Sequence, residues 1–320
     1  MIRLSIIIPV FNAEATLESM LKSLSGQLTQ QTEVIFIDDG STDASPSLLD
    51  AFATQWRDKC KVIHQDNAGV AAARNHGIQL AKGDYLLFLD ADDKIVENAI
   101  EIILGQCQIG ADIIGWDWII ETNGKRRFMR QPDFFTPKDA LENLLGGTMK
   151  WNLWLFCVKR DFVEASGFEC LSGADMGEDM GFMLKAFACA KQVIQIHQPL
   201  YCYNASNPAS ISLQLNERRR VEVTRNLDSV VSFLETTPYA AICHKYLPHL
   251  KLYIKRPLLI GFSFDNYRLW HQWMSEANPY ATKNKELPSR VRILQGMAVK
   301  RLWIGVWLYN CCYRFLLRFK

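Results

Sequence analysis

Residues 83–93 read GDYLLFLDADD, and in this stretch a short apolar run leads directly into a group of acids. Residues 85–89 have the length and composition of a strand buried in a parallel sheet. Asp90, Asp92 and Asp93 follow without a turn residue, so the sequence predicts their carboxylates at the carboxyl end of that strand. In open α/β sheets, ligands bind at this edge.

Asp90 and Asp92 are separated by one small residue, so their carboxylates can share a divalent cation through oxygen. A nucleoside diphosphate is a natural partner of such a cation. The alternative is that these acids cap a helix beginning near Val96, because acidic side chains stabilise the first turn of a helix. The stretch alone leaves both interpretations open.

Strands and helices alternate in the chain before this stretch. Polar residues follow the predicted strands, among them Asn12, the pair Asp38-Asp39, and Asn67 with Arg74. Alternation predicts parallel strands joined by right-handed crossovers, so these polar groups should meet at one edge of one sheet. The predicted strands are residues 4–10, 33–37 and 60–64, and the predicted helices are residues 13–24, 45–56 and 71–81.

From residue 111 the pattern changes. Asn123-Gly124 is a hairpin turn signal between two strand-like runs. Glu178-Asp179 begins an amphipathic helix within residues 173–190. The sequence also predicts strands at residues 111–122, 125–131, 151–159 and 192–203, the last ending in an aromatic loop, a helix at 137–145, and helices at 213–234, 239–264 and 289–320. The fold class is therefore α/β, with a mostly parallel sheet flanked by helices and a helical C-terminal extension.

Composition limits the function classes. The 320 residues are 49% hydrophobic and 22% charged, which is typical of a globular protein. The net charge of +2 does not suggest a nucleic-acid partner. Nine cysteines without a C-x-x-C pair predict reduced thiols and a cytoplasmic location. The apolar run near the N-terminus is short and β-branched, so it predicts a first strand rather than a signal peptide.

Five motifs in order resemble those of glycosyltransferases of family 2, which have the GT-A fold. They are SIIIPVFN (residues 5–12), IDDGSTD (37–43), NAGVAAARNHG (67–77), GDYLLFLDADD (83–93) and GED (177–179). The resemblance covers about the first two thirds of the chain. It implies a catalytic domain over residues 1–212, with a nucleotide-binding half at 1–110 and an acceptor-binding half at 111–212. Residues 213–320 would form a separate helical region.

The resemblance also implies roles for particular residues. The donor would be a nucleoside diphosphate sugar, most simply a UDP-sugar, and the acceptor a saccharide or lipid-linked saccharide. Asp90 and Asp92 would hold ribose and Mn²⁺ or Mg²⁺, and the metal would neutralise the leaving diphosphate. Asp179 would be the general base of an inverting transfer. The other nucleotide-binding residues would be Pro9, Phe11, Asn12, Asp38, Asp39, Asn67 and Arg74.

Several of these residues have structural alternatives. Asp38 could brace its turn, and Arg74 could be an exposed helix arginine paired with a neighbouring acid. Glu178 could be a second base or an acceptor-binding acid, and the alternative is a partner of the helix dipole. His197 could reach the metal, and the alternative is a packed or solvated side chain. The candidates for stacking on an acceptor sugar are Trp151, Trp154 and Tyr203, for which packing in the core is the alternative.

One family feature is incomplete. Ser210 and Ser212 match a Ser-x-Ser that follows the aromatic loop in the family, but the basic residue or histidine ahead of it is absent. A contact from this loop to the diphosphate is therefore not implied.

The C-terminus is basic and apolar. Residues 302–313 carry no charge and lie between Lys300-Arg301 and Arg314. Twelve residues are too few to span a hydrocarbon layer of about 30 Å. The pattern instead predicts either an interfacial helix on anionic lipid, with the protein peripheral on the cytoplasmic face, or a helix packed on the catalytic domain.

Two other function classes compete. A nucleotidyltransferase would need a glycine-rich, basic loop after the first strand, and residues 11–14 (FNAE) contain neither. A non-catalytic carbohydrate-binding protein on a decayed transferase fold would be expected to lack some of the acids, and all of them are present.

Overall fold

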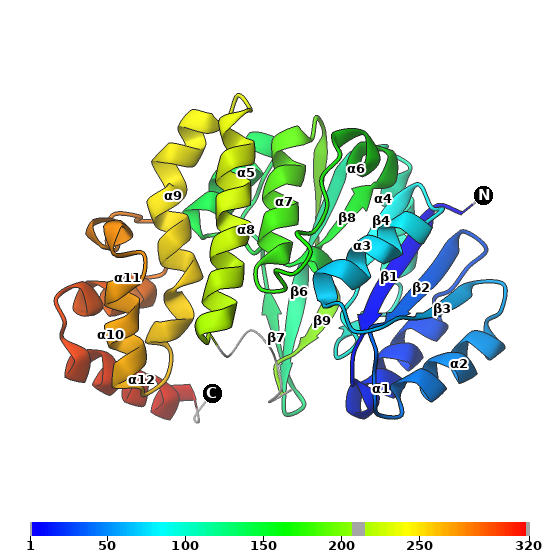
Figure 1. The fold of residues 1–320 in the computed structure, drawn as a ribbon, viewed down its shortest axis with the longest axis horizontal. Helices are drawn as coiled ribbons and strands as arrows, with labels where there is room; N and C mark the ends of the chain where they lie inside the picture. The colour runs from blue at the N-terminus through cyan, green and yellow to red at the C-terminus, as the bar shows by residue number, and fades with distance from the viewer. Residues whose placement is uncertain (1, 207–214, 318–320) are drawn as a thin grey trace.

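A computed structural model describes residues 2–206 and 215–317, with side chains through residue 315. Parallel strands form the first half of its sheet: β1 (Leu4–Val10), β2 (Thr32–Asp38), β3 (Cys60–His64) and β4 (Tyr85–Phe88), in the order β3-β2-β1-β4 (Figure 1). Their crossovers are α1 (Glu14–Ser25), α2 (Ser45–Gln55) and α3 (Val70–Leu80). All four carboxyl ends therefore share one edge, as the sequence predicts.

The second half of the sheet is mixed. Strand β8 (Phe156–Lys159) is antiparallel to both β4 and β6 (Ile113–Thr122), and β9 (Val193–Asn204) is parallel to β6. The predicted hairpin is present, because β7 (Lys125–Met129) pairs with β6 through Asn123 and Gly124, both at positive φ. The short β5 (Lys94–Ile95) pairs with β9 at the far edge. This α/β architecture confirms the predicted fold class.

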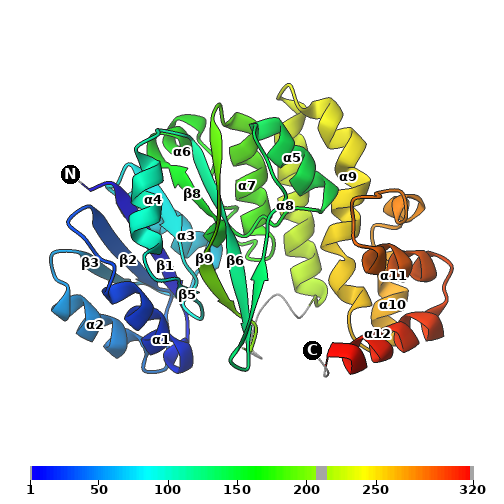
Figure 2. The same ribbon diagram turned by 180° about the vertical axis from the view of Figure 1, so that it is seen from behind.

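Helices cover both faces of the sheet. Figure 1 shows α3 and α7 (Glu178–Cys189) on one face, and Figure 2 shows α1 and α4 (Ala99–Cys107) on the other. Two further helices complete this half, α5 (Pro137–Gly146) and α6 (Arg160–Ser166). The main hydrophobic core lies between these layers, and β2 is buried along its whole length.

The C-terminal helices form two groups. Helices α8 (Glu217–Glu235) and α9 (Ala240–Ile254) contribute Val230, Leu234 and Leu250 to the main core. A second, smaller core joins Leu258, Trp270 and Val306 of the segments that follow. Those segments are η3 (Arg256–Leu259), α10 (Phe264–Gln272), η4 (Ser275–Tyr280), α11 (Ser289–Val299) and α12 (Trp303–Leu317). The division of the chain at residue 212 lies outside the described residues and stays a prediction, as do Ser210 and Ser212.

Some local predictions were wrong. Residues 151–159 are not one strand, because a 3₁₀ turn, η1 (Leu153–Leu155), precedes β8. Strand β9 continues to Asn204 where a loop was predicted. The helix after the acids begins at Ala99 with Asn98 at its N-cap, so Asp90, Asp92 and Asp93 do not cap it.

Two long predicted helices are each divided. The helix predicted at 239–264 ends at Ile254, where a 3₁₀ turn containing Pro257 takes over. The helix predicted at 289–320 is interrupted at Arg301, whose φ of 57° is incompatible with a continuous right-handed helix. Among the described residues, no helix combines the length and the apolarity needed to cross a membrane.

Candidate active site

The loop after β1 and the loop after β2 are hydrogen-bonded to each other. The Asn12 backbone N–H donates to Ser41 Oγ at 3.0 Å, and the Thr42 N–H donates to Asn12 Oδ1 at 2.8 Å. Asn12 has a φ of 48°, which asparagine tolerates better than most residues. Pro9 lies in β1 opposite Ile37, and the Phe11 side chain is 53% exposed beside this loop. The first two motifs therefore form one surface.

Asp39 organises the loop that leads into α3. Its Oδ1 accepts from the Gln65 side chain at 2.8 Å and from the Ala68 N–H at 2.9 Å, and its Oδ2 accepts from the Gly69 N–H at 2.8 Å. The Asn67 side chain donates to the Asp39 carbonyl at 2.8 Å. Asp39 is only 3% exposed, so it links the second motif to the third.

Asp38 is held from another direction. Its Oδ2 lies 2.7 Å from His64 Nδ1, and its Oδ1 accepts from the Ser41 N–H at 3.1 Å. The hydrogen bond to Asp38 raises the pKa of His64. The carboxylate of Asp38 therefore braces the turn, in line with the structural alternative for this residue.

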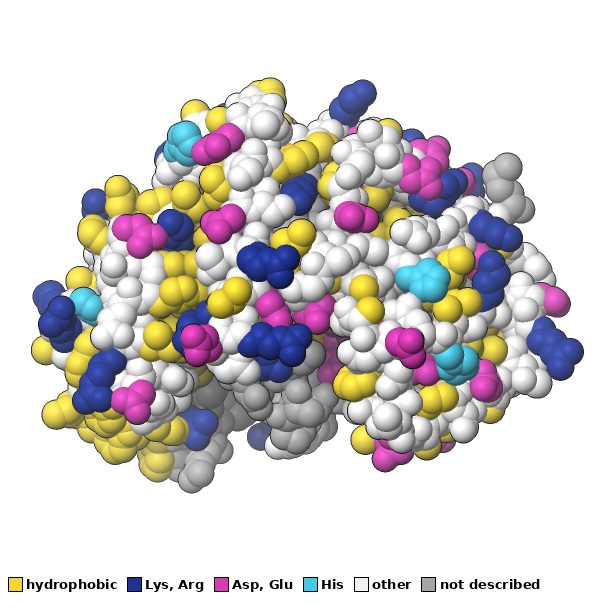
Figure 3. All heavy atoms as spheres, viewed as in Figure 1, with side chains coloured by type: hydrophobic (Ala, Val, Ile, Leu, Met, Phe, Trp, Pro, Cys, Tyr) yellow, Lys and Arg dark blue, Asp and Glu magenta, His cyan; other side chains and the backbone are white. Residues whose placement is uncertain are grey.

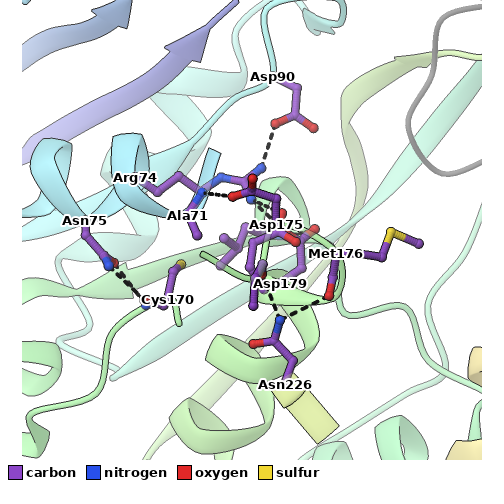
Figure 4. Close-up of polar contacts among 12 residues, drawn as sticks. Ala71, Arg74, Asn75, Asp90, Cys170, Asp175, Met176, Asp179 and Asn226 are labelled. Atoms are coloured by element: carbon purple, nitrogen blue, oxygen red, sulfur yellow. Dashed lines mark hydrogen bonds and ion pairs between the residues drawn. The ribbon is translucent and has the colours of Figure 1, made fainter. Parts of the chain in front are cut away.

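Arg74 joins the third, fourth and fifth motifs. Its Nη2 donates to Asp90 Oδ1 at 2.9 Å, and its Nη1 donates to Asp179 Oδ1 at 2.8 Å and to Glu178 Oε1 (Figure 4). The side chain is 4% exposed, so the alternative of an exposed helix arginine is wrong. Burial opposes its charge, but attraction by Asp179, Asp90 and Glu178 outweighs burial and raises the pKa of Arg74.

The same burial acts on the acids. It raises the pKa of Asp90 to about 6, against the attraction of Arg74. Burial and the neighbouring Asp179 also raise the pKa of Glu178. Three carboxyl groups share one guanidinium, so when more than one of them is ionised their negative charge exceeds that of the cation, and a further cation would be attracted here.

The acidic turn after β4 is supported by β9. Asp93, 1% exposed, accepts from the Tyr201 hydroxyl at 2.7 Å and from the Asn204 N–H at 2.6 Å. The Asn204 side chain donates to the Asp92 carbonyl at 3.3 Å. Asp93 is therefore a structural acid, whereas Asp90 and Asp92 keep part of their surface exposed.

The carboxyl groups of Asp90 and Asp92 have the chemistry that a divalent cation requires. Both offer hard oxygen ligands at the strand end, which suits Mg²⁺ or Mn²⁺. Within the described part of the chain, no three His, Cys, Asp or Glu side chains are arranged to hold a metal ion. Additional ligands would come from the diphosphate and water.

His197, the other candidate metal ligand, has Asp133 as its neighbour. Its Nδ1 lies 4.0 Å from Asp133 Oδ1, and its side chain is about half exposed.

The start of α7 positions Glu178 and Asp179. Gly177 precedes them at a φ of 84°, and Asp179 Oδ2 accepts from the Leu153 N–H at 3.4 Å. The Asn226 side chain, from α8, donates to the Ala174 and Met176 carbonyls at 2.9 and 3.0 Å (Figure 4). A β-carbon on Gly181 would lie 2.9 Å from Asn226 Oδ1, so α8 approaches α7 closely.

Asp175 is a second link between the two halves. Its Oδ1 accepts from the Ala71 N–H at 3.2 Å, at the start of α3 (Figure 4). A β-carbon on Gly69 would lie 2.3 Å from Asp175 Oδ2, so this glycine leaves the room that the contact needs. Sequence reasoning missed Asp175, Asn226 and the role of Asp93. For Asp175 the one available signal was its position two residues ahead of the GED motif.

The two candidate tryptophans differ. Trp154 is 4% exposed, and its ring stacks on Tyr201 with centroids 4.3 Å apart, so it packs in the core. The more distant Tyr203 lies parallel to the same ring at 5.9 Å. Trp151 is partly exposed and meets the edge of Tyr253 at 4.3 Å. Of the two tryptophans, Trp151 is the more exposed.

This fold and the arrangement of its acids define a protein of the GT-A class. Residues 5–171 match the family described as Glycosyl transferase family 2. The chain belongs to this family. It is 30% identical over 206 residues to the putative glycosyltransferase EpsH of Bacillus subtilis. This alignment covers 62% of this chain and 60% of EpsH. The alignment thus spans less than two thirds of that relative.

Solved structures support the same fold over nearly the whole chain. S. aureus TarS 1-349 in complex with UDP-GlcNAc aligns with a TM-score of 0.67 at 17% identity, covering 98% of this chain and 92% of that one. The mannosyltransferase PcManGT of Pyrobaculum calidifontis, in complex with GDP-Man and Mn²⁺, aligns with a TM-score of 0.55 at 17% identity, covering 97% and 85%. At these identities the likeness concerns the fold.

Proposed function

We propose that the protein is an inverting glycosyltransferase that moves a sugar from a nucleoside diphosphate donor to a hydroxyl group of an acceptor. The observation that carries this proposal is the contact of Arg74 with both Asp90 and Asp179. Arg74 lies between Asp90, the acid that would serve the donor, and Asp179, the acid that would serve the acceptor, and contacts both. A site for transfer between two bound molecules needs that proximity.

The donor is most simply a UDP-sugar. The joined loops after β1 and β2, with Pro9, Phe11, Asn12 and Asp39, form the surface proposed for the base and ribose, and Asn67 supports it. The TarS structure was solved with UDP-GlcNAc, which fits this assignment at the level of the fold. Asp38 would contribute by bracing the turn.

Asp90 and Asp92 would hold Mn²⁺ or Mg²⁺ against the diphosphate. A bound cation would neutralise negative charge on the departing nucleotide. PcManGT, whose fold is similar, was solved with GDP-Man and Mn²⁺.

Asp179 is proposed as the general base. Its carboxylate would take the proton of the acceptor hydroxyl as that oxygen attacks the anomeric carbon from the face opposite the diphosphate, which inverts the configuration. Arg74 holds Oδ1 of Asp179 and the Leu153 N–H contacts Oδ2, so the orientation of the carboxylate is fixed. Glu178, buried against Arg74, would position this pair.

The acceptor is proposed to be a saccharide or a lipid-linked saccharide used in cell-surface polysaccharide synthesis. Trp151 offers a partly exposed ring for it, and Glu178 and Trp154 would shape the site from behind. A peripheral location on the cytoplasmic face of a membrane is part of this proposal.

The test is nucleotide release. The purified protein would be incubated with a panel of nucleotide sugars, Mn²⁺ and candidate acceptors, and free nucleoside diphosphate would be measured. Transfer releases the diphosphate and adds one sugar to the acceptor. Release of pyrophosphate would instead indicate a nucleotidyltransferase. Absence of nucleotide-sugar binding in a thermal-shift assay would overturn the proposal, because a ligand of the folded state raises its apparent stability.

A further inference from the structure

Helix α12 presents an apolar face to solvent. The exposed residues are Leu302, which directly precedes the helix, and Ile304, Leu308 and Phe315 within it; they are 51%, 69%, 51% and 61% exposed, and we call them the apolar stripe. The last three follow one another at intervals of four and seven residues, so they lie along one side of the helix. Figure 3 shows hydrophobic side chains gathered at the lower left of the molecule, where α12 lies in Figure 1.

The opposite face of α12 is fixed in the smaller core. Val306 is fully buried, and the Asn310 side chain donates to the Leu259 and Gly261 carbonyls at 2.9 and 3.0 Å. Rotating the helix to bury the apolar stripe would break these bonds and leave a polar group unsatisfied. These contacts therefore fix the orientation of α12, and with it the exposure of the stripe.

Positive charge accompanies the stripe in the sequence. Lys300 and Arg301 directly precede Leu302, Arg314 directly precedes Phe315, and all three cations are exposed. The last acid in the sequence is Glu286. Residues 287–320 contain seven Lys or Arg and no Asp or Glu. A second copy of this basic surface would repel it, whereas an anionic lipid surface would attract it.

A groove extends the same surface along α11. Its volume is about 540 Å³, and the side chains that line it include Arg292 and Lys300 beside Ile293 and Met297. A β-carbon on Gly296 would lie 3.2 Å from Thr282, so the glycine lets the groove wall approach closely. Cations beside apolar side chains suit a lipid headgroup with the start of its acyl chain.

The stripe and the sheet edge that carries the active site lie on the same side of the molecule. In Figure 1 strands β1 and β2 run toward the lower edge, and α12 lies along that edge; Figure 2 shows the same relation from behind. A flat surface in contact with α12 would thus face the side on which the strand ends carry Asp39 and Asp90.

We propose that α12 and the α11 groove bind the surface of an anionic phospholipid bilayer, with the helix lying flat and its apolar stripe inserted among the headgroups. Bound in this way, the protein presents its active site toward the lipid, where an acceptor carried on a lipid would be found. This inference rests on the proposed function for the acceptor, but the binding itself needs neither donor nor transfer.

The experiment is sedimentation of the whole protein with vesicles containing phosphatidylglycerol, compared with vesicles of phosphatidylcholine alone. We expect binding to the anionic vesicles and release by salt, because screening weakens attraction between exposed charges. Replacing both Ile304→Ser and Leu308→Ser should lower the partition coefficient about tenfold or more. Replacing both Lys300→Gln and Arg301→Gln should lower it about fivefold for each cation.

Matched controls lie far from α12. Ile109→Ser removes an apolar side chain that is 53% exposed near α4, and Lys138→Gln removes an exposed cation from α5; both variants should sediment as wild type does. Calorimetry with UDP and Mn²⁺ should give the same affinity for every variant. Protein that binds vesicles but binds no nucleotide sugar of the panel in the thermal-shift assay would keep this inference and overturn the proposed function.

Three results would overturn the inference. The first is equal sedimentation with both vesicle types and no effect of salt. The second is a stripe variant that binds vesicles as well as Ile109→Ser does. The third concerns the oligomeric state. Light scattering that shows a dimer in wild type and a monomer in the stripe variant, without vesicle binding, would assign the surface to a second copy of the chain.

Discussion

Arg74 Nη1 lies 2.8 Å from Asp179 Oδ1, although 105 residues separate them in the sequence. The other terminal nitrogen of the same guanidinium lies 2.9 Å from Asp90 Oδ1. A buried arginine can satisfy several carboxylates at once because its donors are arranged as a planar fork. The three side chains therefore hold a fixed geometry between the proposed donor and acceptor sites.

The first prediction concerns Asp179→Asn. Asparagine keeps the shape of the side chain but cannot take a proton, and loss of a positioned general base typically lowers the rate ~10²–10⁴-fold. UDP affinity should change little, because Arg74 keeps its contacts with Asp90 and Glu178. The measurement is the transfer rate alongside UDP affinity by calorimetry.

Glu178→Gln is the control for that variant. It changes the neighbouring acid, which contacts the same arginine nitrogen, and should reduce the rate less than Asp179→Asn does. Normal turnover of Asp179→Asn with collapse of Glu178→Gln would move the base one residue earlier. A defect confined to UDP affinity would remove Asp179 from the catalytic role.

The second prediction is a stability change in Arg74→Gln. Removing this buried cation leaves Asp90, Glu178 and Asp179 uncompensated, and breaking a buried ion pair from one side costs about 3–5 kcal/mol. The free energy of unfolding from urea titration measures it. Arg126→Gln is the matched control, since that arginine pairs with Glu121 but is 59% exposed, and its loss should cost under ~1 kcal/mol. A loss of unfolding free energy in Arg74→Gln no larger than that in Arg126→Gln would contradict the stabilising role of Arg74.

Position along the strands could be predicted from the sequence, but partners across the fold could not. Asn12, Asp39 and Asp90 each follow a strand with a clear apolar pattern, and parallel strands place such residues on one edge. The contact between Arg74 and Glu178 joins residues 104 positions apart. It depends on the approach of α7 to α3, which no local pattern encodes.

Residue type alone does not predict which aspartate of the acidic turn is buried. Asp92 and Asp93 have the same side chain, but Asp92 is partly exposed and Asp93 is 1% exposed, because the two side chains point in different directions. The same holds for Trp151 and Trp154. The partner that buries Trp154 is Tyr201, whose strand was predicted to end in a loop.

The third prediction concerns the pH dependence of the turn after β2. The hydrogen bond to Asp38 raises the pKa of His64 in the folded protein, with a smaller contribution from Asp50. A raised folded-state pKa adds stability that is complete below the unfolded value of about 6.5 and is lost as the pH rises through the folded value. The difference in unfolding free energy between wild type and Asp38→Asn should therefore be larger at pH 6 than at pH 8.

NMR titration of the His64 ring measures the cause directly. Its pKa should fall in Asp38→Asn and fall less in Asp50→Asn, because Asp50 is 64% exposed and 3.3 Å away. Asp38→Asn should also weaken UDP binding less than Asp39→Asn does. The reason is that the wild-type Asp39 carboxylate holds the loop that leads into α3, through the Ala68 and Gly69 N–H groups. Equal losses of UDP affinity would give Asp38 a direct role in binding.

The last prediction separates the metal from the architecture of the acidic turn. UDP should bind with Mn²⁺ or Mg²⁺ and much more weakly in EDTA, because Asp90 and Asp92 alone bring more negative charge toward the diphosphate. Asp92→Asn should lose the metal-dependent part of the affinity and keep the unfolding free energy of wild type.

Asp93→Ala should instead lose about 1–3 kcal/mol of stability, since the Tyr201 hydroxyl and the Asn204 N–H lose their buried acceptor. Below its melting temperature, Asp93→Ala should keep the response to EDTA. Calorimetry and thermal melts on the same samples give the affinities and the stabilities. The metal site would be contradicted if wild-type UDP binding were insensitive to EDTA, or if Asp92→Asn bound UDP normally. The structural role of Asp93 would be contradicted if Asp93→Ala were as stable as wild type.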